Sequence, residues 1–319
     1  MSNLAGSRDN LFVIARVDAS PTRLACLQAR VDAVPPQAYF VGSAVFHYLG
    51  PAFAVLLFAR VDPVGVAWLR IVSAAVVFAA WRRPWRTLRT VDRRTVRVLA
   101  GLGLVLAAMN SCFYIAIDRL PLGTVAAIEF LPVILLAALG VQSLRNGVAL
   151  AVAAAGVFIL TDVQLQGEPL GVAFAFANAA LFALYIVFAH RVARNSTMGR
   201  IDGLATAMLI ASLAITPIGG WSVAHALVDP VAIGAGIGVG IASSVIPYVC
   251  DQLAMTRLSR ATYSLMISLL PATATVVGIL VLAQIPTAQE LAGVGLVVLA
   301  VAAHRERGDA APTQAPRQS

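Results

Sequence analysis

The sequence contains no lysine, so arginine supplies all 23 of its basic residues. Charged residues of both signs make up only 12% of the 319-residue chain, whereas a soluble domain usually carries about 25%. Hydrophobic residues make up 60%, and the mean hydropathy is +0.85. The shortage of charge excludes an ordinary soluble domain, and the excess of apolar residues predicts an integral membrane protein.

Cysteine and metal-binding patterns are also scarce. The three cysteines, Cys26, Cys112 and Cys250, are odd in number and far apart, which fits neither a disulfide framework nor a zinc site. The sequence lacks the HExxH and GxSxG patterns of metalloproteases and serine hydrolases. We therefore expect no cofactor, no metal and no catalytic residue, and the chain is not predicted to be an enzyme.

The net charge of +8 is compatible with binding to nucleic acid or to a membrane surface. The arginines lie between apolar runs instead of forming one patch, which favours a role in membrane orientation. The expected partners are therefore the lipid bilayer and a small-molecule substrate, with no nucleic acid. The sequence does not indicate an oligomer, and a monomer is compatible with it.

Ten apolar runs approach the roughly 20 residues that a membrane span needs. Two tight turns, "ARVDP" and "DRLPLG", divide neighbouring runs, and the proline of each is suited to the first turn of the next helix. We predict an all-α integral membrane protein with ten transmembrane helices, at residues 39–59, 63–81, 98–117, 121–142, 146–162, 170–190, 203–220, 231–255, 261–284 and 287–303.

The arginines set the expected orientation. With the N-terminus inside the cell, 20 arginines lie on the inner side, many of them in the loop 82–97, and two lie outside, Arg60 and Arg119. This bias follows the positive-inside rule and predicts a multi-pass protein of the inner or plasma membrane with both termini in the cytoplasm. Residues 1–37 lack the apolar run of a signal peptide, so we expect a disordered tail there and a second cytoplasmic tail at 304–319.

Two stretches of the sequence resemble each other at a constant offset. "CFYIAIDRLPLGT" (112–124) aligns with "CDQLAMTRLSRAT" (250–262) at five identical positions, 138 residues apart. Five predicted spans separate the copies, so the second copy crosses the membrane in the opposite sense. Inverted repeats of this kind are typical of secondary transporters, and we predict two five-helix repeats, at residues 38–162 and 163–303.

Glu129 lies within the apolar run 121–142, about nine residues from its start. A charged side chain at mid-membrane costs about 2.5–3.5 kcal/mol on insertion scales, and hydrocarbon favours the neutral form of a carboxyl group. Glu129 is therefore a candidate for substrate binding and for proton coupling. The alternative is a neutral carboxyl group that is hydrogen-bonded for structural reasons.

Further polar groups occur at membrane depth. They are one amide and three phenols: Asn110, Tyr114, Tyr185 and Tyr248. These side chains are suited to hydrogen-bonding a small zwitterion or, alternatively, to joining helices.

Three ionisable residues lie in other spans. Asp251 is a candidate for an inner vestibule or for an ion pair with an arginine at the inner interface. His47 is a candidate for proton coupling or gating, with packing as the alternative. Arg70 is suited to a structural ion pair or to a substrate carboxylate.

Prolines interrupt corresponding spans of the two predicted repeats. Pro132 and Pro271 lie in the fourth and ninth predicted spans. A proline inside a helix frees a carbonyl group and bends the helix. Paired interruptions point to a binding site at the membrane midplane, although proline is also common in membrane helices without such a role.

The glycine-rich stretch "GAGIGVG" (234–240) lies within a predicted span, with no strand before it. Its 234/238 and 236/240 pairs have GxxxG spacing, which predicts close helix packing and not a nucleotide-binding loop.

The sharpest motifs are "MNSCFYIAIDRLPLGTVAAIEF" (109–130) and "PYVCDQLAMTRLSRATYSLMISLLP" (247–271), supported by "VGVAWLR" (64–70). Through them the chain, over about residues 40–303, resembles the EamA-type transporters of the drug/metabolite transporter superfamily, and among them the threonine/homoserine exporters. The resemblance implies ten helices in two inverted repeats with both termini cytoplasmic. It also implies functional roles for Asn110, Tyr114, Glu129, Tyr248 and Asp251.

The second repeat departs from that pattern at two positions. Where the resembling exporters carry glutamate before the proline of the ninth span, this chain has Leu270, and near the end of that span Gln284 replaces another glutamate.

The preferred interpretation is a secondary transporter that exports small amino acids or related metabolites by alternating access, with proton coupling through Glu129 as a further hypothesis. The alternatives are efflux of drugs or other small metabolites, which fits poorly with only 7% aromatic residues, and a membrane enzyme acting on a lipid-linked substrate.

Overall fold

The computed structural model describes residues 34–140, 143–165, 167–193, 200–224, 228–255, 257–258 and 266–303. The predicted C-terminal tail, and all but residues 34–37 of the predicted N-terminal tail, lie outside these ranges. Regular structure in the described ranges is helical throughout. Six helices are long and apolar enough to cross a membrane, and four apolar helices are shorter. The prediction of an all-α membrane protein is therefore confirmed, whereas the count of ten crossings stays a prediction.

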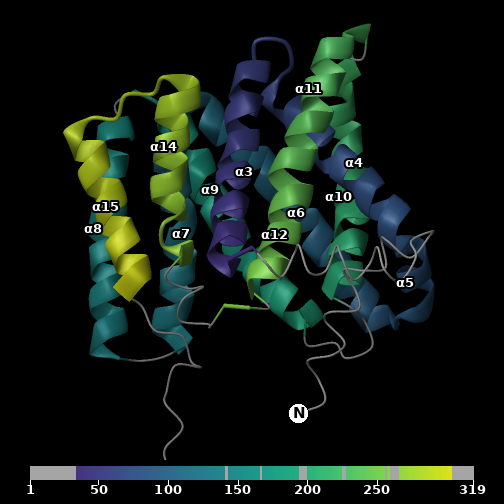
Figure 1. The fold of residues 1–319 in the computed structure, drawn as a ribbon, viewed down its shortest axis with the longest axis horizontal. Helices are drawn as coiled ribbons and strands as arrows, with labels where there is room; N and C mark the ends of the chain where they lie inside the picture. Colours follow the sequence, from purple (N-terminus) through teal and green to yellow (C-terminus); the bar gives the residue numbers. More distant parts are fainter. Residues whose placement is uncertain are drawn as a thin grey trace, which may run out of the picture. The chain divides into compact units, whose positions relative to one another are not determined.

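Apart from the short helix α5, each helix overlaps one of the windows that hydropathy predicted, and Figure 1 shows their arrangement. Their bounds are α3 (Pro36–Leu57), α4 (Pro63–Arg82), α5 (Pro84–Thr90), α6 (Arg93–Arg119), α7 (Leu122–Gly140), α8 (Leu144–Leu165), α9 (Pro169–Ala193), α10 (Arg200–Val223), α11 (Pro230–Gly240), the π-helix η3 (Ile241–Val245), α12 (Ile246–Met255), α14 (Leu270–Leu282) and α15 (Ala288–Ala303).

Proline marks the first turn of several helices, where its missing N–H group costs nothing. α4 begins at Pro63 and α7 begins directly after Pro121, so both predicted turns, "ARVDP" and "DRLPLG", separate helices as expected. Asp229 precedes Pro230 and accepts hydrogen bonds from the backbone N–H groups of Val231 and Ala232, which caps α11.

The arginine-rich segment 82–97 contains a helix that the sequence analysis did not predict. α4 ends at Arg82, and the next residue, Arg83, is a non-glycine residue in the left-handed region with φ of 50°, after which α5 starts at once with Pro84. The expectation of a loop over 82–97 is therefore corrected, since part of it is helical, whereas its role as an orientation signal stays a prediction. The left-handed conformation of Arg83 ends α4, and the fixed φ of Pro84 favours the start of a new helix. Hydropathy did not predict this helix because it contains no apolar run.

The chain divides into two compact units. The first comprises the described residues up to Ala107 together with Phe188–Tyr263, and the second comprises Ala108–Val187 together with the described residues from Ser264 onwards. Each unit takes segments from both halves of the sequence. The compact units are thus distinct from the predicted sequence repeats 38–162 and 163–303, whose inverted relation stays a prediction.

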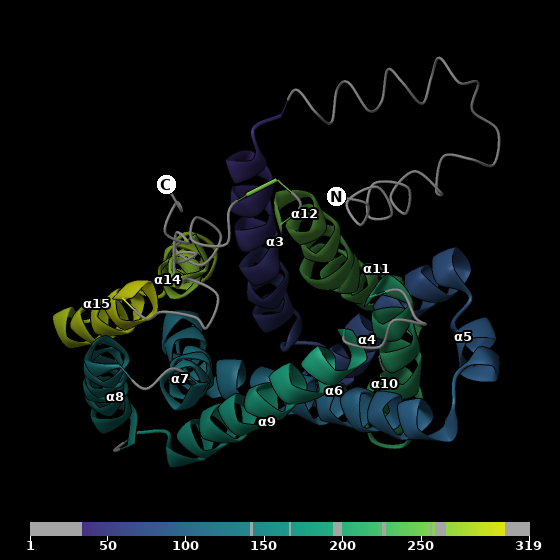
Figure 2. The same cartoon turned by 90° about the horizontal axis from the view of Figure 1, so that it is seen from below.

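The first unit is built around α3, α4, α10, α11 and α12. α4 packs on α10 and α11, while α3 packs on α11 and α12 (Figure 2). Phe78 is fully buried in a cluster with Ala74, Ala205 and Met208, so the α4–α10 contact is apolar at its centre. At one end Arg82 forms an ion pair with Asp202, Nε to Oδ1 at 2.8 Å.

A second ion pair of the first unit joins the turn after α3 to the start of α11. The Arg60 guanidinium donates to Asp229 Oδ2 at 2.8 Å. This hydrogen bond, together with those from the backbone of the first turn of α11, lowers the pKa of Asp229 below the ordinary aspartate value. The carboxylate therefore stays ionised and joins the two segments at neutral pH.

Close packing at the glycine-rich stretch is confirmed for one of its two predicted pairs. A Cβ atom on Gly236 would lie 2.5 Å from Leu69 Cδ1, and one on Gly240 would lie 2.8 Å from the Arg70 carbonyl oxygen and against Ser73 Oγ. Cβ positions on Gly234 and Gly238 have no other atom within 4 Å. Only the 236/240 pair therefore brings α11 against α4, because residues four apart share one helix face.

The second unit is built around α7, α8, α14 and α15. α15 lies along α8, α14 lies along α7, and α7 contacts α8 and α15 (Figure 2). The α8–α15 contact is glycine-mediated, because a Cβ atom on Gly156 would lie 2.7 Å from the carbonyl oxygen of Gly293. Small residues that let helix backbones approach are typical of membrane helix interfaces.

Replacing Gly240 with alanine should destabilise the first unit, because the new Cβ atom would collide with the Arg70 backbone. Gly238→Ala is the matched control, since it lies in the same helix with open space around it, and both changes raise helix propensity by roughly 1 kcal/mol. We expect the melting temperature of the purified protein to fall for Gly240→Ala and to stay equal or rise for Gly238→Ala. Equal effects of the two substitutions would contradict close packing at Gly240.

Candidate functional site

The second unit pairs Glu129 with a residue that the sequence analysis did not select. Asn178 Nδ2 on α9 donates a hydrogen bond to Glu129 Oε1 on α7 at 3.2 Å. Asn178 is fully buried and Glu129 is half-buried. A carboxyl group in an apolar helix therefore has an amide partner from a residue 49 positions away in sequence.

The clue to Asn178 was its position within the apolar stretch "AFAFANAALFALY" (173–185). An amide at membrane depth carries the same signal that selected Asn110. However, one asparagine among apolar residues does not indicate its partner, and only the fold connects it to Glu129.

Two predicted polar residues lie on the part of α6 that belongs to the second unit. Asn110 is 5% exposed and Tyr114 is fully buried, and the Tyr114 ring packs edge-to-face on Phe113 at 5.7 Å between ring centroids. Both side chains are thus interior groups of the unit that holds Glu129, as the proposed binding role requires.

Aromatic rings follow the hydrogen-bonded pair along α7 and α9. Tyr185 stacks on Phe182 at 5.9 Å between centroids, and Phe182 in turn packs edge-to-face on Phe130 at 6.5 Å. Phe130 directly follows Glu129 in the chain. The predicted residue Tyr185 therefore belongs to an aromatic row on the helices that carry Glu129 and Asn178.

The two predicted helix-breaking prolines occupy different places. Pro132 lies inside the continuous helix α7, three residues after Glu129, whereas Pro271 lies in the first turn of α14, after a turn at Ser268 and Leu269. A proline within a helix removes one backbone hydrogen bond and bends the helix. The interruption in α7 thus falls within one turn of the carboxyl group.

Arg70 of the first unit is held by the π-helix. Its Nε donates to Ser244 Oγ and its Nη2 donates to the Ser243 carbonyl oxygen, both at 3.2 Å. Gly50 lies on another side of η3, where a Cβ atom would be only 2.5 Å from Ser243 Cβ. π-Helical turns often occur at functional sites. This one supplies neutral acceptors for two N–H groups of the Arg70 guanidinium, a cation at membrane depth.

The other predicted residues of the first unit are distributed over α3 and α12. Tyr248 packs edge-to-face on Phe78 at 5.7 Å, and so contributes to the apolar cluster. Asp251 lies beside the Ser43 hydroxyl, whose single hydrogen is donated to the Pro247 carbonyl oxygen at 3.2 Å. His47 is half-buried and packs edge-to-face on Tyr48 at 5.1 Å. Their roles in transport stay predictions.

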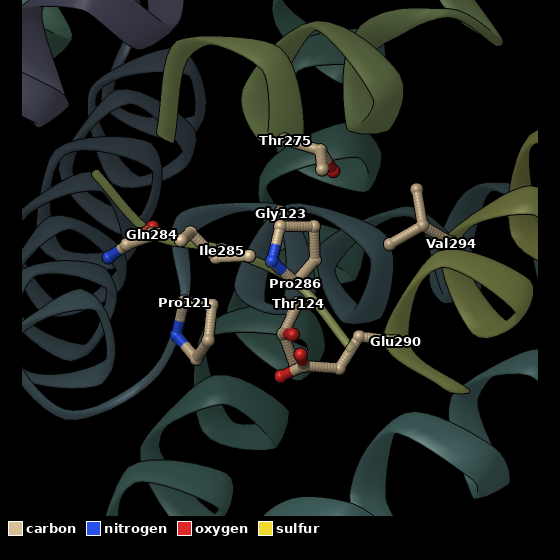
Figure 3. Close-up of a pocket in the computed structure, with 9 residues that line it drawn as sticks. All are labelled: Pro121, Gly123, Thr124, Thr275, Gln284, Ile285, Pro286, Glu290 and Val294. Atoms are coloured by element: carbon tan, nitrogen blue, oxygen red, sulfur yellow. The ribbon is translucent and has the colours of Figure 1, made fainter. Parts of the chain in front are cut away.

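A cavity of about 200 Å³ lies among α7, α14 and α15 in the second unit (Figure 3). Two of its polar groups stabilise helix ends: Gln284 Oε1 accepts the N–H of Leu122, and Glu290 Oε2 accepts the backbone N–H of Thr287. Thr287 Oγ1 accepts the N–H of Glu290 in return, which completes a capping box at α15. None of the predicted site residues lines this cavity.

Comparison with known proteins shows what the chain is similar to. Residues 169–303 match the EamA-like transporter family. The chain carries an EamA domain. It is also 29% identical over 254 residues to the threonine/homoserine exporter RhtA of Escherichia coli K12, an alignment that covers 79% of this chain and 84% of that protein. RhtA of Salmonella typhimurium LT2 is 27% identical over 251 residues, with the same coverage.

The EamA domain includes α9 with Asn178, as well as Tyr185, Tyr248, Asp251 and Pro271. It lies within the predicted second repeat, and Glu129 precedes it in the chain. The resemblance to this family is therefore confirmed. Similarity to transporters favours a transporter over the alternative of a membrane enzyme, and it agrees with a multi-pass membrane protein.

Glu129→Leu should be less stable than Glu129→Gln. Leucine leaves the buried Asn178 Nδ2 without this acceptor, which costs about 1–3 kcal/mol, whereas glutamine keeps an Oε1 acceptor of the same reach. Adding Asn178→Leu to Glu129→Leu should recover stability, because the unmet donor is then removed. Melting temperatures in one detergent measure all three variants. A Glu129→Leu protein as stable as Glu129→Gln would show that the hydrogen bond contributes nothing.

Proposed function

We propose that the protein is a secondary transporter that exports small amino acids or related small metabolites across the inner or plasma membrane by alternating access. Its similarity to the threonine/homoserine exporters supports this substrate class. The observation that carries the proposal is the hydrogen bond between the span residue Glu129 and the buried amide of Asn178. Polar groups within membrane spans are costly and commonly mark a substrate or ion pathway.

The proposed substrate contacts come from the second unit, which supplies Glu129, Asn110, Tyr114 and Tyr185. A carboxyl group, an amide and phenols together offer acceptors and donors for a small zwitterion. The first unit supplies three further candidates: Tyr248 for substrate contact, and Asp251 and His47 for proton transfer or gating. Pro132 and Pro271 are proposed to interrupt their spans for the same function.

The proposed architecture has ten transmembrane helices in two inverted five-helix repeats, residues 38–162 and 163–303, with both tails in the cytoplasm. The distribution of arginine supports the orientation. The match of residues 169–303 to the family supports a unit of that length in the second half of the chain.

Counterflow in proteoliposomes should show saturable exchange of threonine. Vesicles loaded with unlabelled threonine should accumulate labelled threonine, because a carrier exchanges its substrate without net flux. External homoserine should compete, whereas a bulky cationic dye should not. Vesicles that lack the protein are the control for leakage.

Absence of exchange with threonine, homoserine and serine, in protein that elutes as a single monodisperse species, would contradict amino-acid export. Competition by the dye alone would instead support the alternative of drug efflux.

Glu129→Gln should remove the pH dependence of transport if Glu129 couples export to protons, because glutamine cannot gain or lose a proton in this range. Initial efflux rates of the wild-type protein and the variant are compared at several pH values from mildly acidic to mildly alkaline. Glu168→Gln makes the same chemical change next to α9, at a carboxylate whose side chain is 45% exposed and ion-paired with Arg119, and should retain the wild-type profile. An unchanged profile in Glu129→Gln would exclude this residue as the coupling group.

A further inference from the structure

The Asn178 amide has one polar atom whose role the Glu129 hydrogen bond does not explain. Its Nδ2 donates to Glu129, but its buried Oδ1 accepts no hydrogen bond from the part of the chain that the structure describes. The residue is fully buried, so bulk water does not reach this oxygen. Buried polar atoms without a partner are rare in proteins, and each one calls for a specific explanation.

The unpartnered oxygen lies next to a carboxyl group. Oδ1 and Nδ2 are bonded to the same carbon of Asn178, and Nδ2 is 3.2 Å from Glu129 Oε1. The pair therefore combines a carboxylate, which accepts hydrogen bonds and carries negative charge, with a neutral amide oxygen, which also accepts. A ligand group that fits both has to donate more than one hydrogen bond and to carry positive charge.

A primary ammonium group meets these requirements, since it has three N–H donors, no acceptor and one positive charge. A substrate carboxylate would be repelled by Glu129, and a hydroxyl group has only one hydrogen to donate. We propose that Asn178 is a substrate-binding residue whose Oδ1, together with the Glu129 carboxylate, binds the primary ammonium group of the transported molecule. This inference rests on the proposed export function and names the part of the substrate that the pair recognises.

Two small molecules separate the ammonium group from the hydroxyl group of threonine. 2-Aminobutyrate keeps the ammonium group and lacks the hydroxyl, whereas 3-hydroxybutyrate keeps a hydroxyl and lacks the ammonium. Binding of each is measured as the rise in melting temperature of the purified full-length protein with ligand concentration, because a ligand that binds the folded state stabilises it. Inhibition of threonine counterflow is measured in parallel.

Two substitutions separate the acceptor of Asn178 from its donor. Asn178→Leu removes both, whereas Asn178→Asp keeps an acceptor oxygen and replaces only the donor. The new carboxyl group lies beside Glu129, and neighbouring carboxyl groups can share one proton, which limits their repulsion. Asn178→Ala removes both groups without added bulk and replaces the leucine variant if that protein does not elute as a single species. Asn146→Leu is the control, since Asn146 is also a buried asparagine of the second unit but lies on α8, outside the proposed site.

We expect 2-aminobutyrate, and not 3-hydroxybutyrate, to bind the wild-type protein. Asn178→Leu should weaken this binding roughly tenfold or more, since a hydrogen bond to a charged group is worth at least that factor. Asn178→Asp should bind clearly more tightly than Asn178→Leu, and Asn146→Leu should bind like the wild type. A purely structural role as the donor to Glu129 would instead make the aspartate and leucine variants equally weak.

Equal weakening by Asp and Leu, binding unaffected by either change, or equal binding of 3-hydroxybutyrate and 2-aminobutyrate would each overturn the inference. The proposed export function is tested separately by counterflow. If threonine counterflow fails but 2-aminobutyrate still binds in an Asn178-dependent way, the ammonium site stands and the export function does not. If counterflow succeeds while 2-aminobutyrate does not bind, export stands and the ammonium site is overturned.

Discussion

The hydrocarbon of a bilayer offers no hydrogen bonds, so every polar group placed in it has to find a partner within the protein. Helices satisfy the backbone, which is why hydropathy alone predicts where the helices of this chain lie. Side chains have no such general solution. Glu129 meets the requirement through Asn178, and Arg70 meets part of it through Ser243 and Ser244. The arrangement of helices around these residues therefore depends on supplying a specific partner to each one.

In the first unit, a local change from α-helix to π-helix supplies the hydrogen-bond acceptors for Arg70. η3 interrupts the continuous helical path from Pro230 to Met255 with a wider turn, and that turn presents Ser243 and Ser244 to Arg70. The close approach needs small residues on both sides, which Gly50 and Gly240 provide. A side chain at either glycine would move the π-turn away from Arg70. The hydrogen bonds to Arg70 therefore depend on the close helix packing at these two glycines.

The sequence predicted the features that depend on local composition, and missed those that depend on a distant partner. Apolar runs and proline-marked turns predicted the helices, and the isolated charge of Glu129 predicted a buried acid. Asn178 was missed because nothing near it in sequence distinguishes it from an ordinary buried amide. The π-turn "IASSV" also looks like any small-residue stretch, since its geometry follows from Arg70 and Gly50, which lie about 170 to 200 residues earlier.

The acids of the second unit differ in what holds them. Asp118 is exposed at the end of α6, Glu168 forms an ion pair with Arg119 at 3.6 Å, and Glu290 is bonded through a capping box to Thr287, the residue before its own helix. Gln284, where the resembling exporters carry glutamate, accepts a backbone N–H at the start of α7 without adding a charge. Glu129 differs because its partner is a neutral, fully buried amide on another helix, and that amide has an acceptor still unmet within the described chain. A bound cation would satisfy that acceptor and compensate the carboxylate together, so substrate binding and the charge state of Glu129 are physically linked.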